Sequence, residues 1–296
     1  MNVFIEAVGF GIAAGAVVAL GAVGFTVQFG ISNVLNITYG ALMTLAAYLG
    51  YALLAAGVGV WAALAIAAMG IALASVLFNR LLIAPLRRRG TGFVGVVIVT
   101  VSAGIIIQYC IVAIAGPDTV SYGQQAGRTI HAAGLVLTTT QLIIIAIAVA
   151  GMFALHLLLT RTQLGRAMRA TSANPVVARA CGIRTDRIID VTWLLSGALC
   201  GAAGVALAIT TVTFDFTLGP TFLIYMIAAA VLGGIGQPYG AMLGGLVVGV
   251  GTQLAAAYSS PAYQDVYAFG LLILMLLIRP RGLFSAGTAS ARRLAG

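Results

Sequence analysis

The sequence predicts an all-α fold, a polytopic transmembrane bundle of about eight or nine spans that includes one broken or re-entrant helix. Of the 296 residues, 61% are hydrophobic and only 7% are charged, which leaves too little polar surface for a water-soluble globule. Apolar runs recur along nearly the whole chain, and a bilayer span needs roughly 20 such residues. The 38 glycines sit within apolar sequence, where small residues let helices approach closely in lipid.

The expected spans form a single domain, residues 1–296, with one long cytoplasmic loop at about residues 160–189. Apart from His156, no Asp, Glu, Lys, Arg or His falls within them. The first run has no basic residue before it, so we expect it to stay as a span rather than be removed as a signal peptide. The spans are expected at residues 7–29, 38–56, 58–79, 91–115, 138–160, 191–211, 220–236, 239–258 and 266–278.

A polar segment separates the first two runs. Residues 30–40 are too polar for lipid contact, which suggests a broken or re-entrant helix that lines a cavity. Polar side chains within spans either line a transport path or hydrogen-bond to neighbouring helices, and both interpretations stay open here. The candidates for the translocation path are Gln28, Asn33, Asn36, Thr38, Tyr39, Gln108 and Tyr225.

The arginines predict the orientation, because basic residues concentrate in cytoplasmic loops. All 15 basic residues are arginines, and only Arg128 falls on the opposite face, together with Asp118, Asp215 and Asp265. This pattern predicts a cytoplasmic C-terminus and an N-terminus outside. The cytoplasmic clusters are Arg80, Arg87, Arg88 and Arg89; Arg161, Arg166, Arg169, Arg179, Arg184 and Arg187; and Arg279, Arg281, Arg292 and Arg293.

One outer loop, residues 116–141, is long enough to carry structure of its own. It contains the turn-forming residues Pro117, Asp118, Gly123 and Gly127, followed by alternating residues near 129–136. This pattern fits either a small β-hairpin or a plain solvated loop.

The sequence contains no pattern typical of a catalytic or metal site. Lysine is absent, so a nucleotide-binding P-loop cannot form, and any ATP must be bound by another chain. Cys110, Cys181 and Cys200 lack metal-ligand spacing and are expected to be small apolar fillers. No acid–base pair lies at membrane depth, which argues against an intramembrane enzyme. Arginines placed as topology signals do not indicate a nucleic-acid partner.

The loop at residues 160–190 contains signals for a short helix. Asn174 suits the N-cap, Pro175 the first helical position and Gly182 the position after the helix, which predicts about two turns over residues 175–181. Val176, Val177, Ala180 and Cys181 then form an apolar surface with Arg179 beside it. Such a helix either lies against its own bundle and the lipid headgroups or docks on a partner protein.

This loop resembles that of the branched-chain amino acid ABC transporter permease family. The matching residues are Gly165, Arg166, Ala167, Met168, Arg169, Ala170, Asn174, Pro175, Ala178, Ala180, Gly182, Ile183 and Arg187. The resemblance implies that the loop contacts an ATP-binding subunit. The residues it implicates in ATPase coupling are Gly165, Arg166, Arg169, Asn174, Pro175, Val176, Val177, Arg179, Ala180 and Gly182.

Two more stretches extend this resemblance. Residues 229–249 look like the family's glycine-rich turn between two late spans. Residues 34–47 match the family at Asn36 and Gly40, but Tyr39 replaces the usual histidine and Ala41 the usual glutamate, so the solute's identity does not carry over with them.

The resemblance also implies a complete machine in the bacterial plasma membrane. Two ABC ATP-binding subunits would bind the ATP and Mg, so this chain needs no cofactor of its own. A second homologous permease and an extracytoplasmic solute-binding protein would complete the complex, the latter meeting Asp118, Arg128 and Asp215. The solute would be an amino acid, of branched-chain type by resemblance, or a similar small polar molecule.

A different class of function is an ion-coupled secondary transporter or a channel for a small solute. Coupled carriers often place ionisable residues at membrane depth, and this chain has no acidic residue there. Sodium sites built from backbone carbonyls keep this alternative open.

Overall fold

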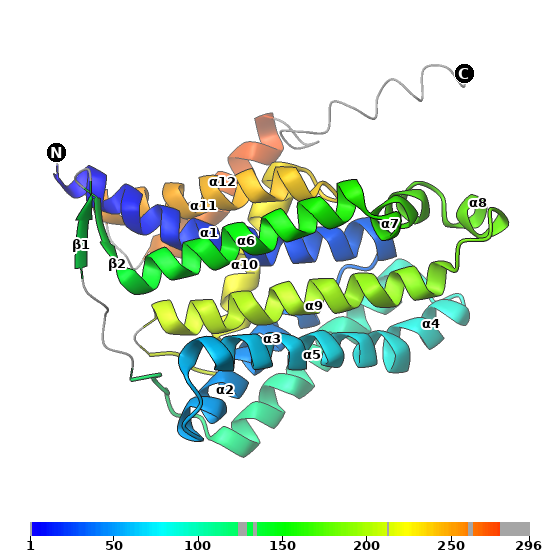
Figure 1. The fold of residues 1–296 in the computed structure, drawn as a ribbon, viewed down its shortest axis with the longest axis horizontal. Helices are drawn as coiled ribbons and strands as arrows, with labels where there is room; N and C mark the ends of the chain where they lie inside the picture. Colours follow the sequence, from blue (N-terminus) through cyan, green and yellow to red (C-terminus); the bar gives the residue numbers. More distant parts are fainter. Residues whose placement is uncertain (1, 124–128, 133–134, 212, 260–262, 279–296) are drawn as a thin grey trace.

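The computed structural model describes residues 2–123, 129–132, 135–211, 213–259 and 263–278. Within them the chain forms a bundle of helices that mostly run along one long axis (Figure 1). Seven of the described helices are long and apolar enough to cross a membrane, and α10 and α12 are shorter apolar helices. The predicted fold class, a polytopic helical bundle, is confirmed.

Each expected apolar run corresponds to a helix. These helices are α1 (Asn2–Ser32), α2 (Thr38–Ala55), α3 (Val60–Phe78), α5 (Phe93–Ala115), α6 (Thr139–Arg161), α9 (Thr185–Thr210), α10 (Leu218–Gly233), α11 (Pro238–Tyr258) and α12 (Gln264–Ile278). Shorter elements join them: a π-helical turn η1 (Asn79–Ile83), α4 (Ala84–Arg88), α7 (Gln163–Ala173) and α8 (Pro175–Ala180).

Glycines bring α1 and α11 close together at the centre of the bundle. A Cβ atom on Gly249 would overlap the backbone of Gly15, and one on Gly15 would lie 3.1 Å from the Cα of Leu246. In lipid, where apolar burial gives little net drive, this close backbone packing stabilises helix pairs. Helix α1 also contacts α6, α9 and α10, whereas α3 packs mainly against α9, and α5 against α2.

The predicted break between the first two spans is present at residues 33–37. Helix α1 ends at Ser32, whose hydroxyl donates to the Gln28 carbonyl at 2.6 Å, and Asn33 takes a positive φ of 51° that turns the chain. Helix α2 then begins against α5, where the Thr38 hydroxyl donates to the Thr100 carbonyl at 2.5 Å. Val34 and Asn36 of the break are buried, whereas Asn33 is exposed. Residues 33–37 line none of the three cavities described below, although Gly30 and Ile31, just before the break, line one of them.

A β-hairpin occupies part of the long outer loop, which confirms the first of the two alternatives for that loop. Strands β1 (Thr129–Ala132) and β2 (Leu135–Thr138) pair antiparallel, with Thr129 opposite Thr138. Thr138 then caps α6: its hydroxyl accepts from the Gln141 amide at 3.3 Å, and the Gln141 side chain accepts from the Thr138 amide at 2.9 Å.

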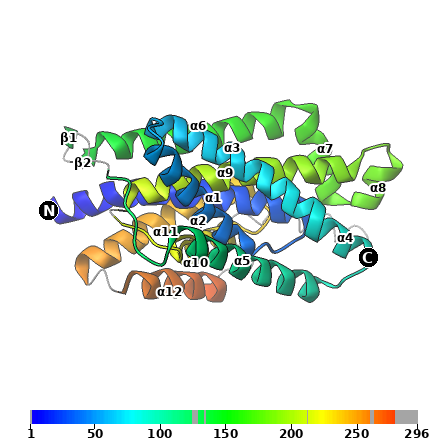
Figure 2. The same cartoon turned by 90° about the horizontal axis from the view of Figure 1, so that it is seen from below.

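The two ends of the bundle differ in character. The hairpin and the start of α1 lie at one end, and α4, α7 and α8 lie at the other (Figures 1 and 2). The arginine clusters at residues 80–89 and 161–187 therefore share one end, as the sequence predicted. Arg128 and the tail arginines Arg279, Arg281, Arg292 and Arg293 lie outside the described residues.

Candidate functional site

Helix α7 is fixed firmly to the bundle. Thr162 caps it, with its hydroxyl accepting from the Gly165 amide at 3.0 Å. A Cβ atom on Gly165 would overlap the carbonyl oxygens of Leu158 and Leu159, so this position requires glycine for the turn out of α6. Met168 is fully buried, and the Arg169 guanidinium donates to the Leu159 carbonyl.

Helix α8 projects from the end of the molecule, as its sequence signals predicted (Figure 1). The Asn174 side chain accepts hydrogen bonds from the Val176 and Val177 amides at 3.0 and 3.1 Å, and Gly182 follows the helix with a positive φ of 84°. Val176 and Val177 are 74% and 55% exposed. Only Ala178 of this helix is buried, so the apolar face expected from the sequence is largely exposed.

Helix α7 is in direct contact with the end of α1. The Ser172 hydroxyl donates to the Gly30 carbonyl at 2.5 Å. Beside this contact lies a cavity of about 260 Å³, which we call the inner cavity; its lining includes Val27, Gly30, Met168 and Tyr239. A displacement of α7 would therefore act on the last turn of α1, next to the break.

The glycine-rich turn between α10 and α11 closes the other side of the inner cavity. Gly233 and Gly240 lie so close that a Cβ atom on either would overlap the other's backbone, and Gly234 has a positive φ of 102°. Gly236 lies against Gly30. The expected tight turn between two late spans is confirmed, and it lies at the α7 end of the bundle.

Several translocation-path candidates gather inside the bundle rather than at a cavity. The Gln28 side-chain oxygen accepts from the Ser196 hydroxyl at 2.9 Å, and the Tyr39 hydroxyl also reaches the Ser196 carbonyl, at 3.3 Å. Gln28 Nε2 and both side-chain polar atoms of Asn36 are buried with no hydrogen-bond partner among the described residues. Unpaired buried polar groups are costly, so these side chains mark a polar region inside the bundle.

The other candidates lie apart from this group. Asn33 is exposed at the break, and Gln108 is half-buried on α5. The Thr38 hydroxyl donates its hydrogen bond to a backbone carbonyl of α5. Of all the candidates, only Tyr225 is among the residues that line the largest cavity described below.

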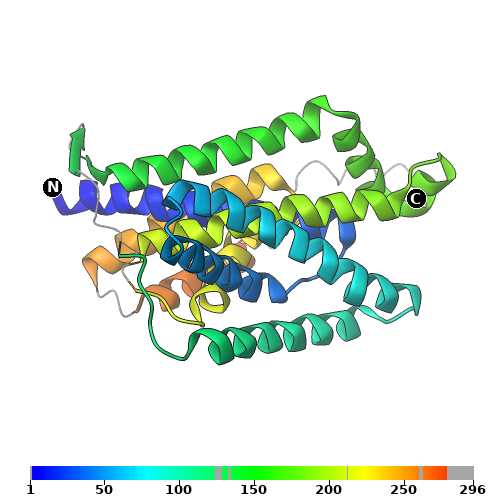
Figure 3. The same cartoon turned by 60° about the horizontal axis from the view of Figure 1, so that its bottom comes forward.

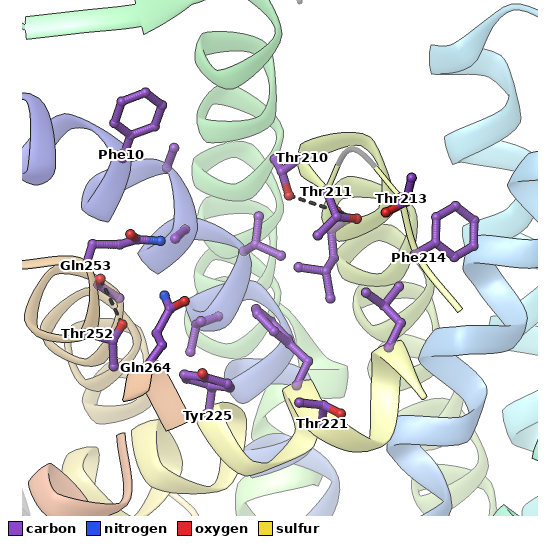
Figure 4. A pocket seen from close by; sticks show the side chains of 18 of the residues that line it. Phe10, Thr210, Thr211, Thr213, Phe214, Thr221, Tyr225, Thr252, Gln253 and Gln264 are labelled. Atoms are coloured by element: carbon purple, nitrogen blue, oxygen red, sulfur yellow. Dashed lines mark hydrogen bonds between the residues drawn. The ribbon is translucent and has the colours of Figure 1, made fainter. Parts of the chain in front are cut away.

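The largest of the three cavities described here, about 610 Å³, opens between α1, α9, α10, α11 and α12 in the half of the bundle nearer the hairpin; we call it the outer cavity. Its lining is amphipathic. Ala14, Val17 and Val18 form an apolar wall on α1. Figure 4 shows threonine, glutamine and tyrosine side chains facing the space from the other helices, among them Thr210, Thr221, Tyr225, Thr252, Gln253 and Gln264.

One aspartate lines the outer cavity, and a second contacts a lining residue. Asp215 is the only Asp, Glu, Lys, Arg or His among the described lining residues, and its Oδ1 accepts from the Thr217 amide and hydroxyl at 2.9 and 2.6 Å. Asp265, exposed at the start of α12, accepts a 2.5 Å hydrogen bond from the Tyr225 hydroxyl. A cavity with this lining suits a small solute that has both an apolar part and hydrogen-bonding groups.

Sequence reasoning missed the outer cavity as a unit. It had singled out Tyr225 for the path and Asp215 for a partner contact, but not the threonines and glutamines. The available signal was the recurrence of threonine and glutamine at the ends of apolar runs, for instance Thr210, Thr211, Gln253 and Gln264.

A short antiparallel β-bridge joins the two outer loops that contain the residues predicted to contact the solute-binding protein. Val120 and Phe214 exchange backbone hydrogen bonds, both 2.9 Å long, so the loop with Asp118 lies beside the loop with Asp215. Tyr122 anchors the first loop by donating to the Ala47 carbonyl at 2.6 Å, and burial raises the pKa of its hydroxyl, which therefore stays a neutral donor. Asp118 is exposed, and Arg128 is outside the described residues.

The described residues contain no group of His, Cys, Asp and Glu side chains that could hold a metal ion. His156, the histidine expected within a span, lies near the end of α6, where its Nδ1 is 2.9 Å from the Tyr239 hydroxyl. This contact fits a packing role.

Comparison with known proteins gives a consistent result. The family described as "Branched-chain amino acid transport system / permease component" matches residues 8–276. The permease protein LivH of the high-affinity branched-chain amino acid transport system is 31% identical in Salmonella typhimurium and 30% identical in Escherichia coli K12, in each case over 95% of both chains. The permease protein LivM of E. coli K12 is 27% identical, over 88% of this chain and 66% of its own.

Proposed function

This chain belongs to the branched-chain amino acid transport permease family, and from that premise we propose that it is the membrane-spanning subunit of an ABC importer for an amino acid of branched-chain type. Separate ATP-binding subunits supply the energy, and this chain breaks no bond in the solute. The observation that carries the proposal is helix α8: a capped, projecting element whose valines are exposed at the arginine-rich end.

Helix α8 has the properties of a docking element. Six residues are too few for a helix that is stable alone, and its caps and the buried Ala178 hold it in shape while its apolar face stays outside. An ATP-binding subunit that covers Val176 and Val177 would remove this apolar surface from water. Motion of that subunit would then pass through α7 and the Ser172–Gly30 contact to the end of α1.

The two cavities fit a transport path that is closed in its middle. Both lie against α1: the outer cavity touches Val17 and Val18, and the inner cavity touches Val27 and Gly30. Between them α1 is buried against Tyr39 and Met226. We call this buried contact of α1 with Tyr39 and Met226 the seal. Alternating access then requires the bundle to open on one side of the seal at a time. The path candidates Gln28, Asn36 and Tyr39 would contact the solute as it passes.

The solute itself is proposed from two considerations. The relatives are named for branched-chain amino acids, whose side chains are apolar and whose backbone carries an ammonium and a carboxylate. The outer cavity offers a wall of alanine and valine, opposed by hydroxyl, amide and carboxylate groups. Tyr225, held by Asp265, is positioned to take part in binding.

The partners and orientation follow from family membership and the arrangement of charge. In addition to two ATP-binding subunits, the complex would contain a second homologous permease, as the LivH and LivM relatives of one E. coli system suggest. We expect one domain in a bacterial plasma membrane, with the N-terminus outside and α8 in the cytoplasm. A solute-binding protein would then meet the loops of Asp118 and Asp215, with Arg128 nearby in sequence.

Reconstitution tests the function directly. Proteoliposomes that contain this chain, its second permease and the ATP-binding subunits should take up radiolabelled leucine from the binding protein only when ATP is supplied on the α8 side. Omitting the ATP-binding subunits serves as the control. Uptake that continues without those subunits, and that collapses when an ion gradient is removed, would establish a secondary carrier instead.

A further inference from the structure

A second surface at the α8 end of the bundle combines unpaired positive charge with an open groove. The groove has a volume of about 490 Å³ and lies between α4 on one side and α8 and the start of α9 on the other. Helices α4 and α8 lie at the same end of the bundle (Figures 1 and 3). Its charged lining is Arg80, Arg87, Arg88, Arg179, Asp186 and Asp190; we call it the arginine groove.

Both aspartates in the groove are already paired within the chain. Asp190 accepts from Asn79 Nδ2 at 2.9 Å and from Arg80 Nε at 2.8 Å, which ties η1 to α9. Asp186 lies 3.3 Å from a terminal guanidinium nitrogen of Arg179, whose Nε donates to the Thr185 hydroxyl at 2.5 Å. The close contacts of these two acids are therefore with Arg80 and Arg179, and the other two arginines of the groove have no carboxylate in direct contact.

The guanidinium groups of Arg87 and Arg88 make no hydrogen bond or close ion pair among the described residues, and both residues are exposed. At longer range Arg87 is attracted by Asp186 and repelled by Arg179. Arg87 and Arg88 lie at the end of a continuous helical stretch, Val60–Arg88, of 29 residues. At 1.5 Å per residue this stretch is about 43 Å long, whereas the hydrocarbon core of a bilayer is about 30 Å thick. The guanidinium groups can therefore reach past the apolar layer into the space that a cytoplasmic partner occupies.

We propose that the arginine groove is a second docking surface, which receives carboxylate side chains from the ATP-binding subunit that covers α8. The inference rests on the proposed function. The groove is continuous with α8, because Arg179 lines it and belongs to the same short helix as Val176 and Val177. A guanidinium group binds a carboxylate through two parallel hydrogen bonds, so an acidic segment would satisfy Arg87 and Arg88 and also fix the partner's orientation.

The groove complements α8 in a specific way. The exposed valines offer apolar area but little directional information. The arginines add long-range attraction and a defined geometry, and charge pairs at the rim of an interface mainly affect the association rate and its salt dependence. Helix α3 is continuous with η1 and α4, and α9 contacts both α8 and η1. A partner bound to both α8 and α4 would therefore move α3 and α9 together.

Neutral substitutions test the proposal while keeping most of the basic residues that set topology. Arg87→Gln and Arg88→Gln should each weaken binding of the ATP-binding subunits to the detergent-purified permease at low salt, on the order of tenfold. The difference should shrink as NaCl is raised, because salt screens exposed charges. The matched control is Arg161→Gln, which removes the same charge from an exposed position at the same end but outside the groove. If both groove variants bind like this control at every salt concentration, the proposal is wrong.

Photo-cross-linking separates a protein ligand from a lipid headgroup, which could satisfy the same arginines. A photoreactive benzoylphenylalanine in place of Arg88 should cross-link to a segment of the ATP-binding subunit that contains Asp or Glu. Cross-links to phospholipid alone would overturn the proposal. Val177→Asp keeps the two hypotheses distinguishable: if it abolishes subunit binding but the groove variants do not differ from the control, only the groove proposal fails. If Val177→Asp also leaves binding intact, the docking role of α8 fails as well.

Discussion

The Tyr39 hydroxyl donates a hydrogen bond to the Gly21 carbonyl, 3.1 Å away, and so joins the first turn of α2 to the middle of α1 across the break that separates them in sequence. The Met226 side chain packs directly against Gly21, so close that a Cβ atom on Gly21 would overlap the Met226 sulfur. The Tyr39 ring packs edge-on against Phe25, with ring centroids 5.7 Å apart. Residues from three helices thus close the bundle between the outer and inner cavities.

Tyr39→Phe tests whether this contact holds the seal. The variant loses a buried hydrogen bond and leaves the Gly21 carbonyl without that donor, which should lower stability by about 1 kcal/mol. We expect the purified permease complex to melt at a lower temperature. We also expect leucine to leak slowly into proteoliposomes that contain no ATP. Tyr109→Phe is the matched control, because Tyr109 is exposed on α5 and has no hydrogen bond among the described residues. A Tyr39→Phe protein that melts and leaks like this control would contradict the assignment.

Tyr225→Phe tests the outer cavity. The change removes the hydroxyl that faces Asp265 and the cavity but keeps the ring packed against Phe222. Because a binding group is lost while the coupling elements are untouched, the KM for leucine uptake should rise severalfold with little change in the maximal rate. Tyr258→Phe, at the exposed end of α11 and outside the cavity lining, should leave both parameters unchanged. An unaltered KM in the Tyr225 variant would remove this residue from the site.

Asp118→Ala and Asp215→Ala test the contact with the solute-binding protein. The two loops are joined by the Val120–Phe214 bridge, so both carboxylates would face the same partner. Each variant should reduce stimulation of ATP hydrolysis by the binding protein, and the loss should diminish at high salt. Basal hydrolysis without the binding protein serves as the internal reference. Full stimulation in both variants would exclude these loops from the interface.

The sequence predicted the framework well because its signals are local. Apolar runs placed the long helices, and Asn174, Pro175 and Gly182 placed both ends of α8 to within a residue. The break after α1 was visible because several polar residues fall together at positions 30–40. These features depend on near neighbours in the chain, which a single sequence displays.

The features that sequence reasoning missed depend on distant residues. The outer cavity is assembled from separate helices, each of which contributes a few hydroxyl or amide groups that alone are typical of helix packing. The arginine groove depends on which arginines contact an acidic residue of the chain: Arg80 contacts Asp190, which lies 110 positions away in the chain, whereas the Arg87 guanidinium makes no close ion pair among the described residues. The sequence shows the charges but not this pairing.

Helix α8 is proposed to be bound by the separate ATP-binding subunit, and a single substitution on α8 provides a direct test. Val177→Asp places a charge on the surface that the ATP-binding subunit is expected to bury, and an uncompensated buried charge costs about 3–5 kcal/mol. With membrane insertion verified, ATP-dependent leucine uptake should fall on the order of a hundredfold or more. Gln163→Asp, which adds the same charge at the exposed start of α7, should retain uptake. Normal uptake by the Val177→Asp protein would contradict the account.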